Sequence, residues 1–266
     1  MPIVHFTKAH AYGNDFLIVP EADVAGVDDL SAMVRHACDR HRGIGANGVM
    51  FVEKTPEGAS TRLFNADGSV SELSGNGVRC VGAWLAFERD LSAGDGVTIG
   101  TGAGPKALVF LGAALRVTTF RASMGPPEDV RQVTLDVANE RVTAVVMRVG
   151  NPQCVLLEPP SVARLHTVAA GLAVHPFFPE GTNVEIAGVE APDLVRVLIW
   201  ERGVGPTAAS GTGACASAVA ASAFGGASRR VQVISPGGTQ QVEWTESDLL
   251  LTGDAEVVGC GELWID

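Results

Sequence analysis

Stretches of alternating apolar and polar residues recur along the chain and predict β-strands. The alternation is clear at residues 3–8, resumes at residues 16–19 after a glycine-containing turn, and returns at residues 114–120 and 142–149. Residues 100–104 contain three glycines but lack the spacing, following helix and acidic partner of a dinucleotide-binding loop, so we expect a tight turn between strands there. The pattern predicts a chain rich in strands.

Helical spacing of apolar residues predicts a small number of helices. Residues 28–41 keep this spacing after Asp28 or Asp29, either of which can cap an ordinary surface helix. Residues 76–87 are apolar on every side, and residues 212–224 are almost all Ala, Val, Ser and Cys. The first of these two helices is predicted to lie buried at the centre of a lobe, and the small side chains of the second allow neighbouring elements to approach closely.

The same short motif precedes both of these helices. Ser-Gly-x-Gly occupies residues 74–77 and residues 210–213. Asn14 lies 60 residues before the first serine, and Asn151 lies 59 residues before the second. Matching motifs at matching spacing predict two similar halves of one design, whose loops meet across a shared cleft.

Length and composition fit this division. The chain has 266 residues, of which 46% are hydrophobic, enough to bury a large core. We expect an N-terminal lobe of residues 1–122 that carries the first loop and a C-terminal lobe of residues 123–266 that carries the second. The last strand of the chain is free to return to the first lobe.

Charge and the cysteine pattern narrow the partners and the setting. The net charge is −11 and there is no basic run, which argues against nucleic acid and anionic membranes as partners. No apolar run reaches about 18 residues, and residues 1–8 lack the apolar core of a signal peptide, so a soluble cytoplasmic protein is predicted. The five cysteines are far apart and form no CxxC pair, so we expect reduced, small apolar fillers rather than disulfides or a zinc site.

Both loops are suited to binding a small anion. Glycines at alternate positions let the backbone approach a ligand closely, and the first turn of the following helix offers unpaired N–H groups that favour a carboxylate. Two such loops face to face would hold a small substrate between two reactive side chains, one for each face of the trapped carbon. Glycine-rich turns between a strand and a helix are also common as purely structural features, and this alternative stays open.

Polar residues near the loops indicate the kind of ligand. Residues 195–205 form a predicted strand that ends in Glu201 and Arg202. The Arg202 guanidinium can donate two parallel hydrogen bonds to a carboxylate, and Glu201 can accept from an ammonium group. The alternative is that the two residues only form an ion pair with each other at the surface. Amide groups, which suit a zwitterionic amino acid, predominate among the other polar residues near the loops: Asn14, Asn65, Asn76, Asn151 and Asn183.

Lysine usage argues against pyridoxal phosphate, which needs a lysine for its Schiff base. The chain has only Lys8, Lys54 and Lys106, and none lies beside the paired loops in the sequence. Chemistry at an α-carbon without a cofactor or metal is therefore favoured. One group would remove a proton from one face of the carbon, and its partner would deliver a proton to the other.

Several segments together resemble the diaminopimelate epimerase family, in order and over essentially the whole chain. They are residues 10–16, 42–48, 64–69, 75–80, 150–152, 182–185, 201–207 and 211–216. The resemblance implies an α/β (α+β) fold with two pseudo-symmetric lobes, each a mostly antiparallel sheet wrapped around a central helix. It also implies cofactor-free interconversion of LL- and meso-diaminopimelate, a step of lysine and peptidoglycan biosynthesis, and a homodimer as a frequent state.

The resemblance also implies roles for individual residues. Ser74 and Ser210 stand at the two positions of the catalytic acid and base. The backbone N–H groups that would bind the reacting carboxylate belong to Gly75, Asn76, Gly211 and Thr212. The side chains that would hold the rest of the substrate are Asn14, Asn65, Asn151, Asn183, Glu201 and Arg202.

At both catalytic positions the family carries cysteine, and the serines change the expected chemistry. A thiol with a pKa of about 8.5 can supply a thiolate, whereas serine ionises many pH units higher and needs a neighbouring base. Gln153 replaces the usual histidine, Asn47 the usual aspartate and Ala11 the usual glycine. Epimerisation by two thiols is therefore not expected of this sequence.

Three interpretations follow. The first is a diaminopimelate epimerase whose thiols have been replaced, naturally or by design, which leaves Gln153 and Asn47 unexplained. The second is a divergent relative that acts as an isomerase or dehydratase on another amino-acid-like molecule, with one serine as a weak acid. The third is a non-catalytic protein that binds an amino acid or a peptide. Solvent hydrogen exchange, release of a keto acid and saturable binding without exchange distinguish the three.

Overall fold

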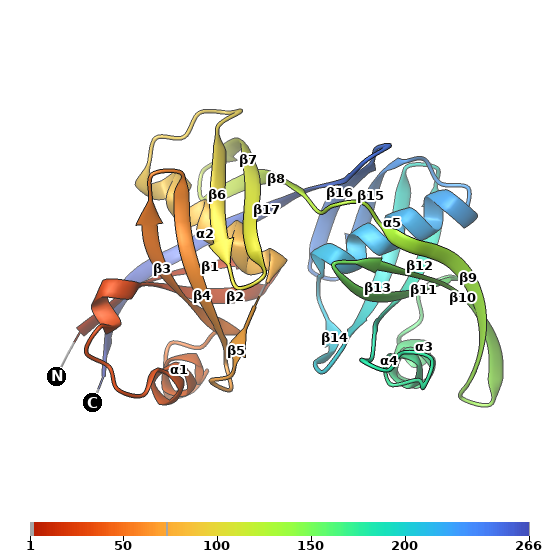
Figure 1. Ribbon diagram of the computed structural model, residues 1–266, viewed down its shortest axis with the longest axis horizontal. Helices are drawn as coiled ribbons and strands as arrows, with labels where there is room; N and C mark the ends of the chain where they lie inside the picture. The colour runs from red at the N-terminus through yellow and green to blue at the C-terminus, as the bar shows by residue number, and fades with distance from the viewer. Residues whose placement is uncertain (1–2, 73, 266) are drawn as a thin grey trace. The chain divides into compact units, whose positions relative to one another are not determined.

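The computed structural model describes residues 3–72 and 74–265. They fall into two compact units (Figure 1). Unit 1 comprises Met1–Ala122 and Gly253–Asp266, and unit 2 comprises Ser123–Thr252. The long strand β17 (Leu249–Trp264) begins in unit 2 and continues in unit 1. Each unit has its own central helix and apolar core.

Unit 1 is a ring of paired strands around one helix. Pairing runs β1–β2–β3–β4–β6–β7–β8, and β17 closes the ring by pairing with both β8 and β1. The β2–β3 and β4–β6 pairs are parallel, whereas β1–β2, β3–β4, β6–β7 and β7–β8 are antiparallel. The elements are β1 (Ile3–Ala11), β2 (Asn14–Pro20), η1 (Glu21–Val24), α1 (Leu30–Cys38), β3 (Gly48–Thr55), β4 (Gly58–Asn65), β5 (Val70–Ser71), α2 (Gly75–Glu88), β6 (Gly96–Thr101), β7 (Gly104–Ala114) and β8 (Val117–Ser123).

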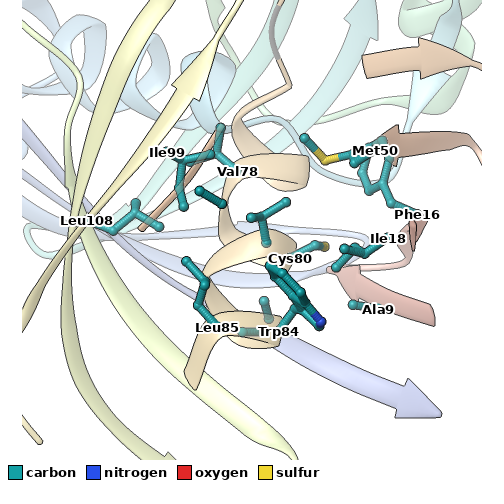
Figure 2. Close-up of a cluster of buried hydrophobic side chains, with 14 of the residues drawn as sticks. Ala9, Phe16, Ile18, Met50, Val78, Cys80, Trp84, Leu85, Ile99 and Leu108 are labelled. Atoms are coloured by element: carbon teal, nitrogen blue, oxygen red, sulfur yellow. The ribbon is translucent and has the colours of Figure 1, made fainter. Parts of the chain in front are cut away.

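Helix α2 lies inside this ring because it is apolar on every side, as its sequence predicts. Its residues 77–85 are all buried. Figure 2 shows labelled side chains of α2 (Val78, Cys80, Trp84, Leu85) among those of the surrounding strands (Ala9, Phe16, Ile18, Met50, Ile99, Leu108). A second apolar cluster packs α1 against the other face of the sheet. Helix α1 begins after Asp29, whose side chain accepts a hydrogen bond from Ala32 N at 2.9 Å and so caps the helix.

Unit 2 repeats this plan around α5. Pairing runs β9–β10–β11–β12–β13–β15–β16, followed by the first part of β17. The β11–β12 and β13–β15 pairs are parallel. The elements are β9 (Glu128–Val137), β10 (Glu140–Val149), β11 (Asn151–Leu157), α3 (Val162–Arg164), η2 (Leu165–Ala169), α4 (Ala170–Ala173), β12 (Asn183–Ala191), β13 (Leu194–Glu201), β14 (Gly205–Thr207), α5 (Gly211–Phe224), β15 (Arg230–Ser235) and β16 (Gly238–Trp244).

The strand registers of the two units correspond. Phe16 pairs with Gly48 in the parallel β2–β3 pair, and Gln153 pairs with Asn183 in the parallel β11–β12 pair. The central helices α2 and α5 both have 14 residues and both follow a Ser-Gly-x-Gly turn. The predicted α+β fold, with two similar lobes that each wrap a mostly antiparallel sheet around a helix, is confirmed.

Asn47 has a structural role at the start of β3. Its N–H donates to Asp15 Oδ1 at 3.1 Å, and its Oδ1 accepts from Asp15 N at 3.2 Å. Arg40 and Lys8 hold the same carboxylate at 2.8 Å and 3.1 Å. Burial opposes the charge of Asp15, yet the hydrogen bonds from Arg40 and Lys8 keep the pKa of this carboxyl below its ordinary value. Asn47 therefore ties the starts of β2 and β3 together.

One expectation about the cysteines is wrong. Cys38, Cys80, Cys154 and Cys215 are buried, as expected of apolar fillers, but Cys260 is exposed on β17. It lies in a run of three exposed residues where β17 pairs with β1, opposite Thr7. Period-two alternation breaks there because the register shifts at Lys8 and Ala9 of β1.

Candidate functional site

The first serine loop forms the start of α2. Ser74 is the N-cap residue, with φ −134° and ψ 118°, and its Oγ accepts a hydrogen bond from Gly77 N at 3.1 Å. Gly75 opens the helix, and no heavy atom lies within 4 Å of the position that a Cβ would occupy on it. The N–H groups of the first turn of an α-helix have no partner within the helix, so this end of α2 is suited to an anion.

A buried polar cluster supports this loop. Arg79 is only 1% exposed, its Nη2 donates to Asn76 Oδ1, and its guanidinium carbon lies 5.7 Å from the centre of the Tyr12 ring. The Tyr12 hydroxyl oxygen accepts from Asp254 N at 2.8 Å. These contacts tie the first turn of α2 to the β1–β2 turn and to β17. The side chain of Asn76 is thus held within unit 1, and its predicted contribution to ligand binding is its backbone N–H.

Asn14 and Asn65 lie on the same face of the sheet as this loop. Successive side chains of a strand point to opposite faces. Phe16 and Leu63 belong to the core around α2, so Asn14 and Asn65, each two positions away, point to the α2 side. Asn65 Nδ2 donates to the Ser69 hydroxyl at 3.0 Å, which holds the amide in place at the end of β4.

The second serine loop is a close copy of the first. Ser210 caps α5 with φ −138° and ψ 133°, and its Oγ accepts from Gly213 N at 3.1 Å. Ser210 Oγ also lies 3.4 Å from the Thr212 hydroxyl. Gly211 is buried. Helix α5 carries no charged side chain over its length, so its N-terminal dipole is the local source of positive potential.

A row of polar side chains lies beneath the start of α5. Val155, Ala187 and Ile199 belong to the core around this helix, so side chains an even number of positions away on the same strands face it too. The polar side chains at such positions are those of Asn151, Gln153, Asn183, Glu185 and Glu201. The α5 side of the sheet is therefore apolar under most of the helix and polar under its N-terminus.

Hydrogen bonds fix three of these polar groups, Asn151, Gln153 and Asn183. Gln153 is fully buried, and its Nε2 donates to Asn151 Oδ1 at 2.5 Å. Asn183 is also buried, and its Oδ1 accepts from Arg202 N at 2.9 Å. Gln153, at the place of the family's usual histidine, thus serves to fix Asn151.

Glu201 and Arg202 have different surroundings at the end of β13. Glu201 is half-buried, and burial raises the pKa of its carboxyl. The Arg202 side chain is exposed, and its Nη1 donates to the carbonyl oxygen of Glu180 at 2.8 Å. No ion pair joins Glu201 to Arg202 within the described residues, so the alternative of a surface ion pair between them is wrong.

The buried polar residues that were not singled out as site residues from the sequence include Arg79, Gln153 and Glu185. Each interrupts an otherwise apolar, buried face of α2, β11 or β12. A polar residue in an apolar alternation is the signal that identifies such positions. Glu185 is the most unusual of the three, because it is fully buried and carries a carboxyl group.

Known proteins resemble this chain over nearly its whole length. The family model described as diaminopimelate epimerase matches residues 6–128 and 145–258. The diaminopimelate epimerase of Pelotomaculum thermopropionicum is 37% identical over 281 residues, covering 97% of this chain and 98% of that protein. The diaminopimelate epimerase of Desulforudis audaxviator is 38% identical over 278 residues, covering 98% of this chain and 99% of that protein. The chain belongs to the diaminopimelate epimerase family.

Solved structures share the fold of this chain. A predicted epimerase from Pseudomonas aeruginosa has a TM-score of 0.73 at 15% identity, covering 99% of this chain and all of that one (100%). A probable proline racemase from Agrobacterium radiobacter has a TM-score of 0.72 at 17% identity, covering 99% and 93%. At such identity these likenesses concern the fold alone.

Two further observations bear on the site and its setting. Among the described residues, no group of three or more His, Cys, Asp or Glu side chains is placed to hold a metal ion. Within the same part of the chain, no helix is both long and apolar enough to cross a membrane.

Proposed function

We propose that this protein binds diaminopimelate through its two serine loops and is an isomerase of the cofactor-free kind, with impaired activity. The observation that carries the proposal is the matched pair of Ser-capped, glycine-opened helix N-termini, each beside inward-facing amide or carboxyl side chains. The curated relatives that cover nearly the whole chain bear the name diaminopimelate epimerase.

Each group has a part in the proposed complex. The N–H groups of Gly75, Asn76, Gly211 and Thr212 bind the carboxylate at the reacting carbon. The Glu201 carboxylate accepts hydrogen bonds from the ammonium group, and Arg202 donates hydrogen bonds to the carboxylate at the far end of the molecule. The remaining amide groups that hold the substrate are Asn14, Asn65, Asn151 and Asn183. Ser74 and Ser210 act as the weak acid and base toward the α-carbon.

Titration calorimetry with LL-diaminopimelate, meso-diaminopimelate and L-lysine tests the binding. Lysine lacks the second carboxylate, so we expect it to bind about 10-fold to 100-fold more weakly, as befits a lost charge-assisted pair of about 1.5–3 kcal/mol. Arg202→Met should weaken diaminopimelate binding by a similar factor and leave lysine binding unchanged. Equal affinity for lysine and diaminopimelate, or the same loss for both ligands in the variant, would contradict the assignment of Arg202.

A second candidate function keeps the site but changes the reaction. Because serine is a poor base, one serine acting only as a weak acid would suit a dehydratase for a hydroxylated amino acid. Such a protein releases a keto acid, which a carbonyl reagent detects. A binder without chemistry gives saturable calorimetric titration and neither keto acid nor exchange of the α-proton.

We also propose a homodimer that works in the cytoplasm, where five free cysteines stay reduced. Support for the dimer comes from two large exposed apolar side chains, Ile3 (46% exposed) and Trp264 (66%), which pair across β1 and β17. Trp264→Glu should convert the dimer to a monomer in sedimentation analysis. Val174→Glu, at a valine of unit 2 that is still more exposed, should leave it a dimer. A wild-type monomer at micromolar concentration would refute this proposal.

A further inference from the structure

The carboxyl group of Glu185 is buried in the interior of unit 2 without a hydrogen-bond partner among the described residues. Its side chain is 0% exposed, and neither Oε1 nor Oε2 has a hydrogen-bond partner among the described residues. A buried carboxyl without partners is costly to keep, because it loses its hydrogen bonds to water and gains none in return. Such a group calls for an explanation in terms of function.

Glu185 lies directly beside the second serine loop. A Cβ placed on Gly213 would lie 2.8 Å from Glu185 Oε1 and 3.3 Å from Ser210 Oγ. The two oxygens therefore flank the same small space, which stays open because residue 213 is glycine. Gly213 N also donates to Ser210 Oγ at 3.1 Å, so the serine and the carboxyl both lie beside the first turn of α5, without a direct hydrogen bond between them.

Unit 1 provides an internal control at the equivalent position. Met50 follows Gly48 by two residues on β3, as Glu185 follows Asn183 on β12, and the two strands have the same register with their neighbours. A Cβ on Gly77 would lie 2.7 Å from Met50 Sδ. Figure 2 shows Met50 beside the first turn of α2. The fold thus accepts a methionine at this place, and the packing of unit 2 does not require a carboxyl.

The surroundings of Glu185 raise the pKa of its carboxyl group. Burial raises the pKa of the Glu185 carboxyl well above its ordinary value, and the Glu201 carboxylate on β13 raises it further. On β11 the neighbouring titratable group is the Cys154 thiol, which is itself buried. Helix α5 contributes no charged group to this environment. Burial and the neighbouring carboxylate thus both favour the protonated form of Glu185 over the ionised form.

We propose that Glu185 is a positioning residue that exchanges a proton with Ser210 through one bridging water molecule, so that the second loop has a built-in acid where the first has Met50. When Ser210 gives its hydroxyl proton to a carbanion, the Glu185 proton passes to Oγ and a carboxylate remains on Glu185. In the reverse direction, the carboxylate takes the hydroxyl proton while Oγ takes the α-proton. At the equivalent position in unit 1, beside Ser74, the Met50 side chain cannot exchange a proton. The catalytic part of this inference rests on the proposed function, but the sharing of the proton does not.

A thiol placed at the serine position tests the sharing without any ligand. In a chain carrying Ser210→Cys and Cys260→Ser, which removes the exposed thiol, the rate of alkylation by iodoacetamide is followed against pH. Glu185→Gln and Glu185→Met should each lower the midpoint of this profile by about 1 pH unit or more. The reason is that an ionised carboxylate opposes a second negative charge beside it, and two such groups titrate as a coupled pair.

The matched control uses unit 1. In a chain carrying Ser74→Cys and Cys260→Ser, Met50→Leu should leave the alkylation midpoint in place. If both Glu185 variants fold but leave the midpoint of the Ser210→Cys chain unchanged, the proposal is overturned. Because no substrate takes part, this result is independent of whether the protein binds diaminopimelate.

Discussion

Replacing both serines by cysteine, in a Ser74→Cys, Ser210→Cys chain, is expected to raise the exchange of the LL-diaminopimelate α-proton with solvent deuterium by at least about 10²-fold. The parent chain should show almost none. Proton NMR follows both the loss of the α-proton signal and the appearance of the meso isomer.

The expected gain comes from acidity and not from geometry. The two serines already cap their helices in nearly the same backbone conformation. In each case Oγ accepts a hydrogen bond from the N–H of the residue three positions later in the chain. A thiol at such a position has a pKa of about 8.5, and the helix N-terminus lowers it further, so a thiolate is available near neutral pH. A serine hydroxyl in the same place stays protonated. Cysteine caps a helix less well, so each replacement should also cost about 1 kcal/mol of stability.

Single replacements separate the two halves of the reaction. Inversion needs a base on one face and an acid on the other, so Ser74→Cys alone and Ser210→Cys alone should give less of the meso isomer than the double variant. A Ser74→Ala, Ser210→Ala chain should bind the ligand and exchange nothing. Rapid exchange by the parent would contradict the view that serine is too weak a base here, and exchange by none of the chains would point to a different ligand.

The sequence predicted the elements of the site better than the interactions that support them. The two loops could be found because Ser-Gly-x-Gly is a local pattern and capping depends on residues three apart. Asn47 could not be understood in the same way. Its hydrogen bonds to Asp15 join residues 32 positions apart in the chain, and only the parallel β2–β3 register brings them together.

Glu185 shows a second limit of sequence reasoning. In the sequence it is one charged residue within Asn183-Val184-Glu185-Ile186, and most glutamates at strand positions are exposed. Its burial becomes visible only when β12 is placed between β11 and β13 with α5 across it. The repeat did contain a hint, because Met50 is its counterpart in the first half, but aligning the halves requires the strand register.

The second large effect is expected at Glu201. Glu201→Gln should weaken binding of LL- and meso-diaminopimelate by about 10²-fold. A hydrogen-bonded contact between a carboxylate and an ammonium group contributes about 1.5–3 kcal/mol, and its loss leaves the ammonium group without a counter-charge. Calorimetry measures the affinity. Glu190→Gln, which removes an exposed carboxylate paired with Arg196 on the same sheet, should change it little.

The pH dependence gives an independent check on this role. The ammonium group binds the ionised form of Glu201, and burial raises the pKa of that carboxyl, so protonation competes with the ligand at a higher pH than for an ordinary glutamate. Affinity for diaminopimelate should therefore be full above the raised pKa of Glu201 and fall as the pH drops through it. Glu201→Gln should remove this fall while Glu190→Gln retains it. A parent protein whose affinity stays constant until the pH reaches the range of exposed carboxyls would argue that another group receives the ammonium.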